Sequence, residues 1–138
     1  MDTSVDPKGE RFYQEVLGKD VFDEKNPPPL TGVRVFTVNH LFANVWSRSD
    51  APVGKTVSVR ERRLVTIALL AAQGHAEQLK DHVRGAFLAG LTEDELIELM
   101  IHVAHYAGWA AGTSGQRQIR DVFKEARKSS PRVTDKDR

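Results

Sequence analysis

Apolar residues recur every three or four positions along most of this chain. That spacing is typical of amphipathic helices, because a turn of 3.6 residues places such positions on one face. Residues 64–72 are apolar nearly all the way round, which predicts a central helix. The β-branched start of the segment from 33 leaves its first turn open between helix and strand. The expected helices cover residues 9–17, 33–49, 58–73, 76–89, 93–109 and 114–128. The predicted fold class is all-α, a bundle of five or six helices.

Polar residues mark the starts of three of these helices. Ser58 followed by Glu61, and Thr92 followed by Glu95, each have the spacing of a capping box. In that motif the hydroxyl accepts from the third helical amide, and the glutamate side chain accepts from the cap residue's own amide. Ser114 is interpreted as the N-cap of the last helix. Glycines follow three of the predicted helices, where a left-handed residue ends the turn.

The chain divides into three predicted parts. Residues 1–31 form an N-terminal helical arm and a connector, because consecutive prolines at 27–29 fix φ and remove hydrogen-bond donors. Residues 32–128 form the helical core, and residues 129–138 a polar tail. The arm has too little apolar surface to stand alone, so it is expected to pack on the core or on a neighbouring subunit. The two nearly all-apolar helices also predict apolar surface buried between subunits.

Composition narrows the function classes. The 138 residues carry a net charge of +1, which gives no electrostatic reason for a nucleic-acid or membrane partner. The chain has no cysteine, which removes disulfides, thiolate metal sites and thiol redox chemistry. The N-terminus lacks the pattern of a signal peptide, and no apolar run is long enough to span a membrane. A cytoplasmic location is the expectation.

Histidines in consecutive helices are the main candidates for chemistry. His82 lies on the apolar stripe of its helix, either as a core residue with one hydrogen bond or as a general acid or base. On the next helix Glu98, His102 and His105 share a face, with Tyr106 beside His102. These side chains either satisfy one another or face a pocket, where His82 and His102 are expected to meet. A zinc or iron site built from Glu98, His102 and His105 is a third alternative, although no thiolate or His-Glu-x-x-His motif supports it.

A second cluster contains Trp46, Arg48 and Arg62. The ordinary interpretation is a core tryptophan and arginines that bond to backbone carbonyls. The functional alternative is an apolar wall beside an anion clamp, because a guanidinium grips a carboxylate with two parallel hydrogen bonds.

Taken together, these residues resemble the carboxymuconolactone decarboxylase family, whose fold also holds the AhpD-type alkylhydroperoxidases. The similarity covers most of the chain. The matching residues are Glu15 to Gly18, Val45 to Arg48, Arg62, Leu64 to Thr66, Gln78, Leu79, His82 to Ala86, Gly90 to Thr92, Glu95, His102 and Tyr106 to Gly108. The resemblance implies an AhpD-like helical bundle that needs no cofactor. It also implies a homo-oligomer, either a trimer or a hexamer built as a trimer of dimers.

The resemblance also implies a reaction. His75 and Gln78 stand where the peroxidase branch has its two cysteines, so thiol peroxidase chemistry is excluded. The decarboxylase branch converts 4-carboxymuconolactone into an enol-lactone and CO2 in the β-ketoadipate pathway of aromatic catabolism. No cofactor or metal is required, because the lactone accepts the electron pair that CO2 leaves behind.

By position, the catalytic residues are His82 as general acid, with His102 and Tyr106 as oxyanion or orienting groups. The substrate-binding residues are Trp46, Arg48, Arg62, Gln78 and His105.

Some residues depart from the family pattern. Asn44 stands where the decarboxylases have a carboxylate, and His105 replaces an aliphatic residue. A related reaction on a different carboxylated lactone or small acid is therefore an open alternative. So are a non-catalytic oligomeric protein that binds a small ligand, and the metal-dependent enzyme.

Overall fold

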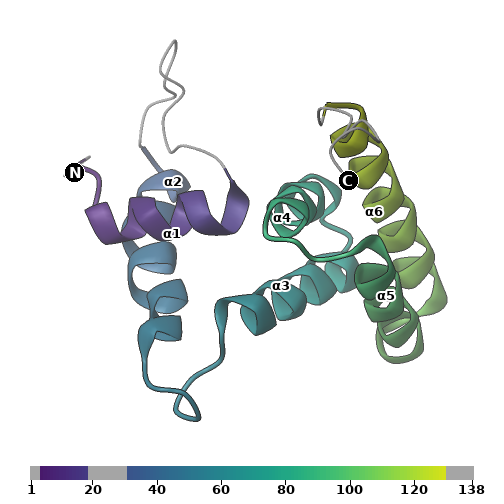
Figure 1. Cartoon of the computed structure of the whole chain (residues 1–138), viewed down its shortest axis with the longest axis horizontal. Helices are drawn as coiled ribbons and strands as arrows, with labels where there is room; N and C mark the ends of the chain where they lie inside the picture. Colours follow the sequence, from purple (N-terminus) through teal and green to yellow (C-terminus); the bar gives the residue numbers. More distant parts are fainter. Residues whose placement is uncertain (1–3, 19–30, 130–138) are drawn as a thin grey trace, which may run out of the picture. The chain divides into compact units, whose positions relative to one another are not determined.

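The computed structural model describes residues 4–18 and 31–129, and all the regular structure within them is helical (Figure 1). The all-α prediction is confirmed. The elements are α1 (Pro7–Leu17), α2 (Val33–Phe36), the π-helix η1 (Thr37–Val45), the 3-10 helix η2 (Trp46–Asp50), α3 (Val59–Gln73), α4 (Ala76–Leu88), α5 (Glu93–Ala107) and α6 (Trp109–Ser129). They fall into two compact units, residues 1–66 and 67–138, and α3 begins in the first and ends in the second. The proline connector and the polar tail after 129 lie outside the described residues.

In the first unit, α1 starts two residues earlier than the apolar pattern predicts. Asp6 is its N-cap, and the carboxylate accepts from the amides of Lys8 at 2.8 Å and Gly9 at 3.3 Å. Pro7 follows as the first helical residue, where its missing N–H costs nothing. The apolar pattern missed this turn because a cap and a proline carry the start signal. Gly18 ends the helix in the left-handed region at φ 64°, as predicted.

Helix α1, which belongs to the predicted arm, packs on η1 within the first unit. Aromatic and aliphatic side chains from α1, η1 and η2 form its core: Phe12, Val16, Leu17, Phe42 and Trp46. Phe42 and Trp46 stack with centroids 5.8 Å apart, and Tyr13 meets the edge of Phe42 at 5.3 Å. The helix predicted over 33–49 is continuous but changes pitch, from α to π to 3-10.

A buried cation ties α1 to α3. Arg63 is 2% exposed, and its guanidinium donates to the backbone carbonyls of Val16 and, at 3.1 Å, Glu15. Those carbonyls belong to the last turn of α1, where helical partners are missing and the dipole is negative. Burial lowers the pKa of Arg63 from its ordinary value, while the Glu15 carboxylate raises it. The guanidinium therefore acts as a C-terminal cap supplied from 47 residues away.

Both predicted capping boxes are present. The Ser58 amide donates to the Glu61 carboxylate at 2.7 Å, and the Thr92 amide donates to the Glu95 carboxylate at 3.0 Å. In return, the Glu61 and Glu95 amides donate to the Ser58 and Thr92 hydroxyls, both at 3.1 Å. The backbone bond from Ser58 lowers the pKa of the Glu61 carboxyl. The end of α4 is a Schellman motif with Gly90 at φ 87°, as predicted.

In the second unit, α6 is the helix against which both α4 and α5 pack. Its contact with α5 is close, because a Cβ added at Gly112 would lie 2.6 Å from the Cβ of Ala104. A Cβ added at Gly115 would lie even closer to the Met100 sulfur. These two glycines allow the backbones of α5 and α6 to approach, and a larger residue at either position would separate them.

One prediction about this unit was wrong. The last helix begins at Trp109 instead of Ser114, so Ser114 lies inside α6 and is no N-cap. Within a single chain, α5 buries Leu96, Met100 and Val103, while Ile101 and Tyr106 are 47% and 83% exposed. Burial of its other apolar faces between subunits stays a prediction.

We expect Arg63→Ala to lower the free energy of unfolding by about 3–4 kcal/mol, because it leaves two carbonyls of α1 without their donor. Arg63→Lys should fall between this variant and the wild type, since an ammonium lacks the planar fork of donors. Arg120→Ala, at an exposed position of α6, should change stability by less than about 0.5 kcal/mol. Urea denaturation followed by circular dichroism measures all three. Equal stabilities of the Arg63→Ala and Arg120→Ala variants would contradict the capping role.

Candidate functional site

The C-terminal half of α5 carries the predicted histidine and tyrosine pair. The rings of His102 and Tyr106 stack with centroids 4.7 Å apart at an interplanar angle of 19°. This follows from their i, i+4 spacing, which places both side chains on one face of the helix. Tyr106 is 83% exposed and His102 is also exposed, so both polar groups are accessible from solvent. The stack sets the two rings nearly parallel on an exposed face of α5.

His105 lies one turn from the end of the same helix and has a defined tautomer. Its Nδ1 is 2.7 Å from the carbonyl oxygen of Ile101. A carbonyl only accepts, so Nδ1 carries the proton, and in the neutral ring Nε2 is left as an acceptor. The ring also meets Trp109 edge to face, with centroids 5.7 Å apart. His105 therefore presents one free nitrogen at the junction of α5 and α6.

His82 and Gln78 lie on α4, one turn apart. His82 is partly buried beside the core residues Leu79 and Ala86, and Gln78 is exposed in the first turn. Because α4 and α5 each pack chiefly against α6, the expected meeting of His82 with His102 stays a prediction. The partial burial of His82 suits either a core histidine or a general acid whose proton is partly shielded from water.

The side chains of Trp46 and Arg62 both have structural contacts within the first unit. Trp46 is 4% exposed inside the aromatic core, which favours the packing alternative. The Arg62 Nε donates to Ser49 Oγ at 2.9 Å and to the Val57 carbonyl at 3.2 Å. Its Nη2 donates to Thr56 Oγ1 at 3.3 Å. Arg62 therefore holds the loop between η2 and α3, and those donors are not free for a carboxylate.

Arg48 differs from Arg62 in being exposed at the end of η2. Its backbone carbonyl accepts from Thr56 Oγ1 at 2.7 Å, whereas its guanidinium makes no hydrogen bond or ion pair with the described part of the chain. Of the two arginines, Arg48 keeps its donors available for an anion. Its role as a carboxylate anchor stays a prediction.

The geometry of a single chain does not support the predicted metal site. Within residues 4–18 and 31–129, no three His, Asp or Glu side chains are grouped closely enough to hold an ion. His102 is stacked on Tyr106, and the Nδ1–H of His105 is used by a backbone carbonyl. Glu98, His102 and His105 thus share a helix face without forming a ligand set.

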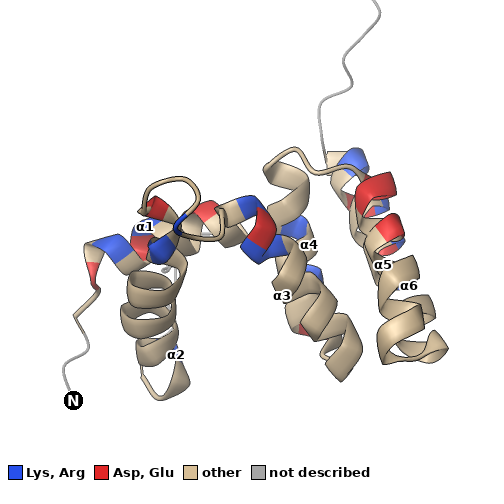
Figure 2. Cartoon of the chain, turned by 90° about the horizontal axis from the view of Figure 1, so that it is seen from below, with Lys and Arg blue, Asp and Glu red and all other residues tan. Residues whose placement is uncertain are grey.

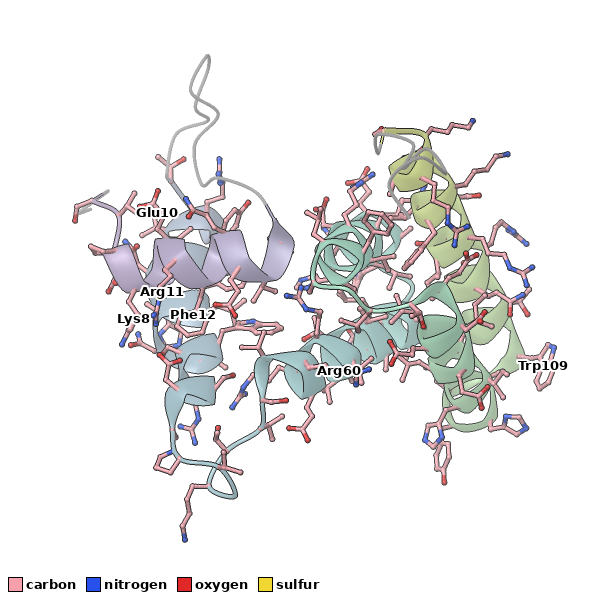
Figure 3. All side chains as sticks on the ribbon, in the orientation of Figure 1. Lys8, Glu10, Arg11, Phe12, Arg60 and Trp109 are labelled. Carbon is pink, nitrogen blue, oxygen red and sulfur yellow. The ribbon has the colours of Figure 1, made fainter. Side chains whose placement is uncertain are left out.

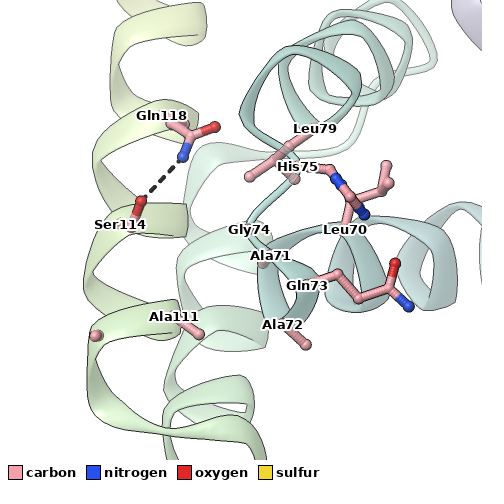
Figure 4. Close-up of a pocket in the computed structure, with 11 residues that line it drawn as sticks. Leu70, Ala71, Ala72, Gln73, Gly74, His75, Leu79, Ala111, Ser114 and Gln118 are labelled. Carbon is pink, nitrogen blue, oxygen red and sulfur yellow. Dashed lines mark hydrogen bonds between the residues drawn. The ribbon is translucent and has the colours of Figure 1, made fainter.

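The second unit has a hollow that the sequence did not predict (Figure 4). It measures about 320 Å³ and lies between the end of α3, the turn into α4 and the first half of α6. Its polar lining includes His75, Ser114 and Gln118, and the Gln118 amide donates to Ser114 Oγ at 3.1 Å. The available signal was the i, i+4 spacing of Ser114 and Gln118 among small residues. It was missed because Ser114 was interpreted as a cap.

Comparison with known proteins defines the class of this chain. Residues 36–119 match the model of the carboxymuconolactone decarboxylase family. This match covers more than half of the chain and includes every predicted site residue. An all-helical chain with these residues at these positions belongs to the carboxymuconolactone decarboxylase family.

Two relatives are similar over much of the chain. One is a 4-carboxymuconolactone decarboxylase from Acinetobacter baylyi, 38% identical over 90 residues, which are 65% of this chain and 63% of the relative. The other is a nitrosuccinic acid decarboxylase from Metarhizium robertsii, 30% identical over 105 residues, or 73% of this chain and 68% of the relative. The chain thus spans somewhat under two thirds of the first relative's length. Among the described helices, none has the length and apolarity needed to cross a membrane.

The two arginines can be separated by stability. We expect Arg62→Ala to lower the free energy of unfolding by about 1–2 kcal/mol, because one hydrogen bond to η2 and two to the loop after it are lost. Arg48→Ala should stay within about 0.5 kcal/mol of the wild type, since its exposed guanidinium makes no hydrogen bond or ion pair with the described part of the chain. Urea titration of both variants under one condition measures the difference. Equal losses would show that Arg48 also supports the fold.

Proposed function

We propose that this protein is a cofactor-free decarboxylase acting on a small acid that carries at least two carboxylates or a carboxylated lactone. The observation that carries the proposal is the similarity to two relatives that are both decarboxylases. The family match supports it, and the absence of cysteine removes the thiol chemistry of the neighbouring branch.

The names of the two relatives' substrates suggest what their chemistry shares. Each substrate has an electron-withdrawing group, a lactone in one and a nitro group in the other. When the bond to the carboxyl carbon breaks, CO2 leaves and the electron pair moves onto oxygen, as a dienolate or a nitronate. A proton then returns to carbon, and the product keeps its remaining carboxylate. The substrate is its own electron sink, so the protein must stabilise the oxyanion and deliver one proton.

The second unit supplies groups suited to both tasks. Tyr106 O–H and the His102 ring are donors fixed by their stack, and preorganised donors of this kind stabilise a developing oxyanion by roughly 3–4 kcal/mol. His82 is assigned as the general acid, because partial burial keeps its proton from exchanging freely with water. His105 and Gln78 are assigned to substrate contact, His105 through its free Nε2.

The direct test is CO2 release by chelator-treated protein from 4-carboxymuconolactone, from nitrosuccinate and from a panel of related carboxylated lactones. We expect His82→Ala to lower kcat by about 10²–10⁴-fold through loss of the general acid. Tyr106→Phe should lower kcat by about 10²–10³-fold through loss of one oxyanion donor. His75→Ala is the matched control, an exposed histidine outside the assigned residues, and should leave kcat within about twofold.

Three results would overturn parts of this proposal. Absence of CO2 from every substrate, with a folded protein that still binds them, would favour the non-catalytic ligand-binding alternative. Activity lost on chelation and restored by zinc or iron would favour the metal-dependent alternative. Equal losses for His82→Ala and His75→Ala would remove His82 from the mechanism.

A further inference from the structure

The hollow between the end of α3, the turn into α4 and the first half of α6, called the α3–α6 hollow below, has no charged side chain in its lining. It measures about 320 Å³, and no Lys, Arg, Asp or Glu lines it. No charged residue occurs from Leu64 to Ala76 or from Leu99 to Gln116, so the last turns of α3 and the first turns of α6 are tan in Figure 2. None of the residues assigned to catalysis or substrate contact lines the hollow. It is an uncharged space with a lining of its own.

One buried polar atom of this lining has no hydrogen-bond partner. The Gln118 amide donates through Nε2 to Ser114 Oγ at 3.1 Å, whereas its Oε1 is buried and accepts no hydrogen bond from the described part of the chain. Figure 4 shows the nitrogen pointing along α6 to Ser114 and the oxygen pointing away from that helix. A buried acceptor without a donor destabilises a fold. The unpaired Oε1 therefore indicates that the hollow receives a donor from another molecule.

Ser114 supplies a complementary donor. Its oxygen accepts from Gln118, and its own O–H makes no hydrogen bond with residues 4–18 or 31–129. The neighbouring Thr113 differs, because its hydroxyl donates to the Trp109 carbonyl at 2.9 Å. The last torsion of a glutamine is broad, so the Gln118 amide can tilt toward the hollow and offer Oε1 beside the Ser114 hydroxyl. The hollow thus offers one acceptor and one donor from adjacent turns of α6.

A second hollow along α6 lacks this combination. It measures about 230 Å³ and lies beside Trp109, whose ring points away from the helices (Figure 3). None of the described residues that line this second hollow has a buried polar atom without a partner. Of the two hollows, the α3–α6 hollow is the one whose polar groups call for a ligand.

We propose that the α3–α6 hollow binds a small uncharged molecule in which an amide group is joined to an apolar body. One edge of a primary amide carries an N–H and a carbonyl side by side. The N–H donates to Gln118 Oε1, and the carbonyl accepts from the Ser114 hydroxyl. Leu70, Leu79 and Ala111 line the space for the apolar body. An apolar cavity of roughly 150 Å³ already holds benzene, so the hollow has room for a ring and an amide together.

The lining disfavours charged ligands of the same size. A carboxylate carries only acceptors, so it would meet the unpaired Oε1 of Gln118 and find no cation in the hollow. An ammonium would find no carboxylate there. The substrate proposed for decarboxylation is an anion, so the ligand of the hollow is a different molecule. Binding there requires no turnover, and it can fail while the decarboxylase proposal stands.

Fluorine NMR with three probes of one shape tests the chemistry of the hollow. We expect the resonance of 4-fluorobenzamide to broaden and shift as the full chain is added, with a dissociation constant of roughly 1 mM for a probe of this size. In 4-fluoroacetophenone a methyl group replaces the amide nitrogen, and this probe should bind about fivefold more weakly because it brings no donor to Gln118. The carboxylate of 4-fluorobenzoate should bind more weakly still.

Four variants locate the binding. Gln118→Leu should weaken 4-fluorobenzamide about tenfold and bring it level with 4-fluoroacetophenone. Ser114→Ala should weaken both of these probes, because each has a carbonyl. Ala111→Leu should abolish binding by filling the hollow. Thr113→Ala is the matched control, since its hydroxyl is used within α6 and it lines the other hollow, and it should bind like the wild type. Circular dichroism checks that each variant is folded.

A stability measurement on Gln118→Leu adds a readout that needs no probe. Its urea midpoint should rise, because the substitution removes an unpaired buried oxygen. A lower midpoint would show that the oxygen is paired in the fold and would overturn the proposal. Equal binding of 4-fluorobenzamide and 4-fluoroacetophenone by the wild type, or binding that survives Ala111→Leu, would also overturn it. So would displacement of 4-fluorobenzamide by 4-carboxymuconolactone, which would place the probe among the catalytic groups.

Discussion

The close approach of α5 and α6 is the constraint on which the second unit depends. Gly112 and Gly115 have no side chain, so Ala104 and Met100 on α5 fill the space where one would lie. This contact fixes the rotation of α5 about its own axis. It thereby decides that Val103 is buried while His102 and Tyr106 face outward. The outward position of the proposed catalytic pair is therefore a consequence of two missing side chains.

The first unit depends on one buried cation. Arg63 reaches the last turn of α1 and replaces the hydrogen bonds that the helix cannot make for itself. Val16, whose carbonyl accepts from Arg63, is also part of the cluster that contains Phe12, Phe42 and Trp46. Two arginines adjacent in sequence therefore have structural duties, Arg63 toward α1 and Arg62 toward the loop before α3. An arginine near a predicted site is better judged by the acceptors already around it than by its charge.

Local signals in the sequence predicted local structure well. Both capping boxes and the glycine stops were correct, because each motif satisfies its own hydrogen bonds within a few residues. The predicted start of α6 was wrong because Ser114 was interpreted as a cap, whereas it lies inside α6 between two glycines that pack against α5. A glycine can end a helix, or it can allow a neighbouring helix to approach closely. These two roles can be distinguished only when the position of the neighbouring helix is known.

The site could be predicted less fully than the fold. An apolar pattern indicates that α5 is covered, without indicating whether its own chain or another molecule covers it. Trp46 packs in an aromatic core, and Arg62 donates to Ser49. The sequence alone does not show that these partners lie close in space. Family similarity identified His82, His102 and Tyr106 by position, but it could not show that Tyr106 is exposed. The hollow lined by Ser114 and Gln118 required three separate segments to be assembled.

The distance in sequence between Arg63 and Val16 also bears on the order of folding during synthesis. Gly18 can end α1 locally, yet the carbonyl of Val16 meets its donor only 47 residues further along the chain. Helices α5 and α6 are consecutive and can pair as soon as both are made, since contacts between neighbouring elements close quickly. Helix α1 is therefore expected to reach its full stability only after α3 has begun to form.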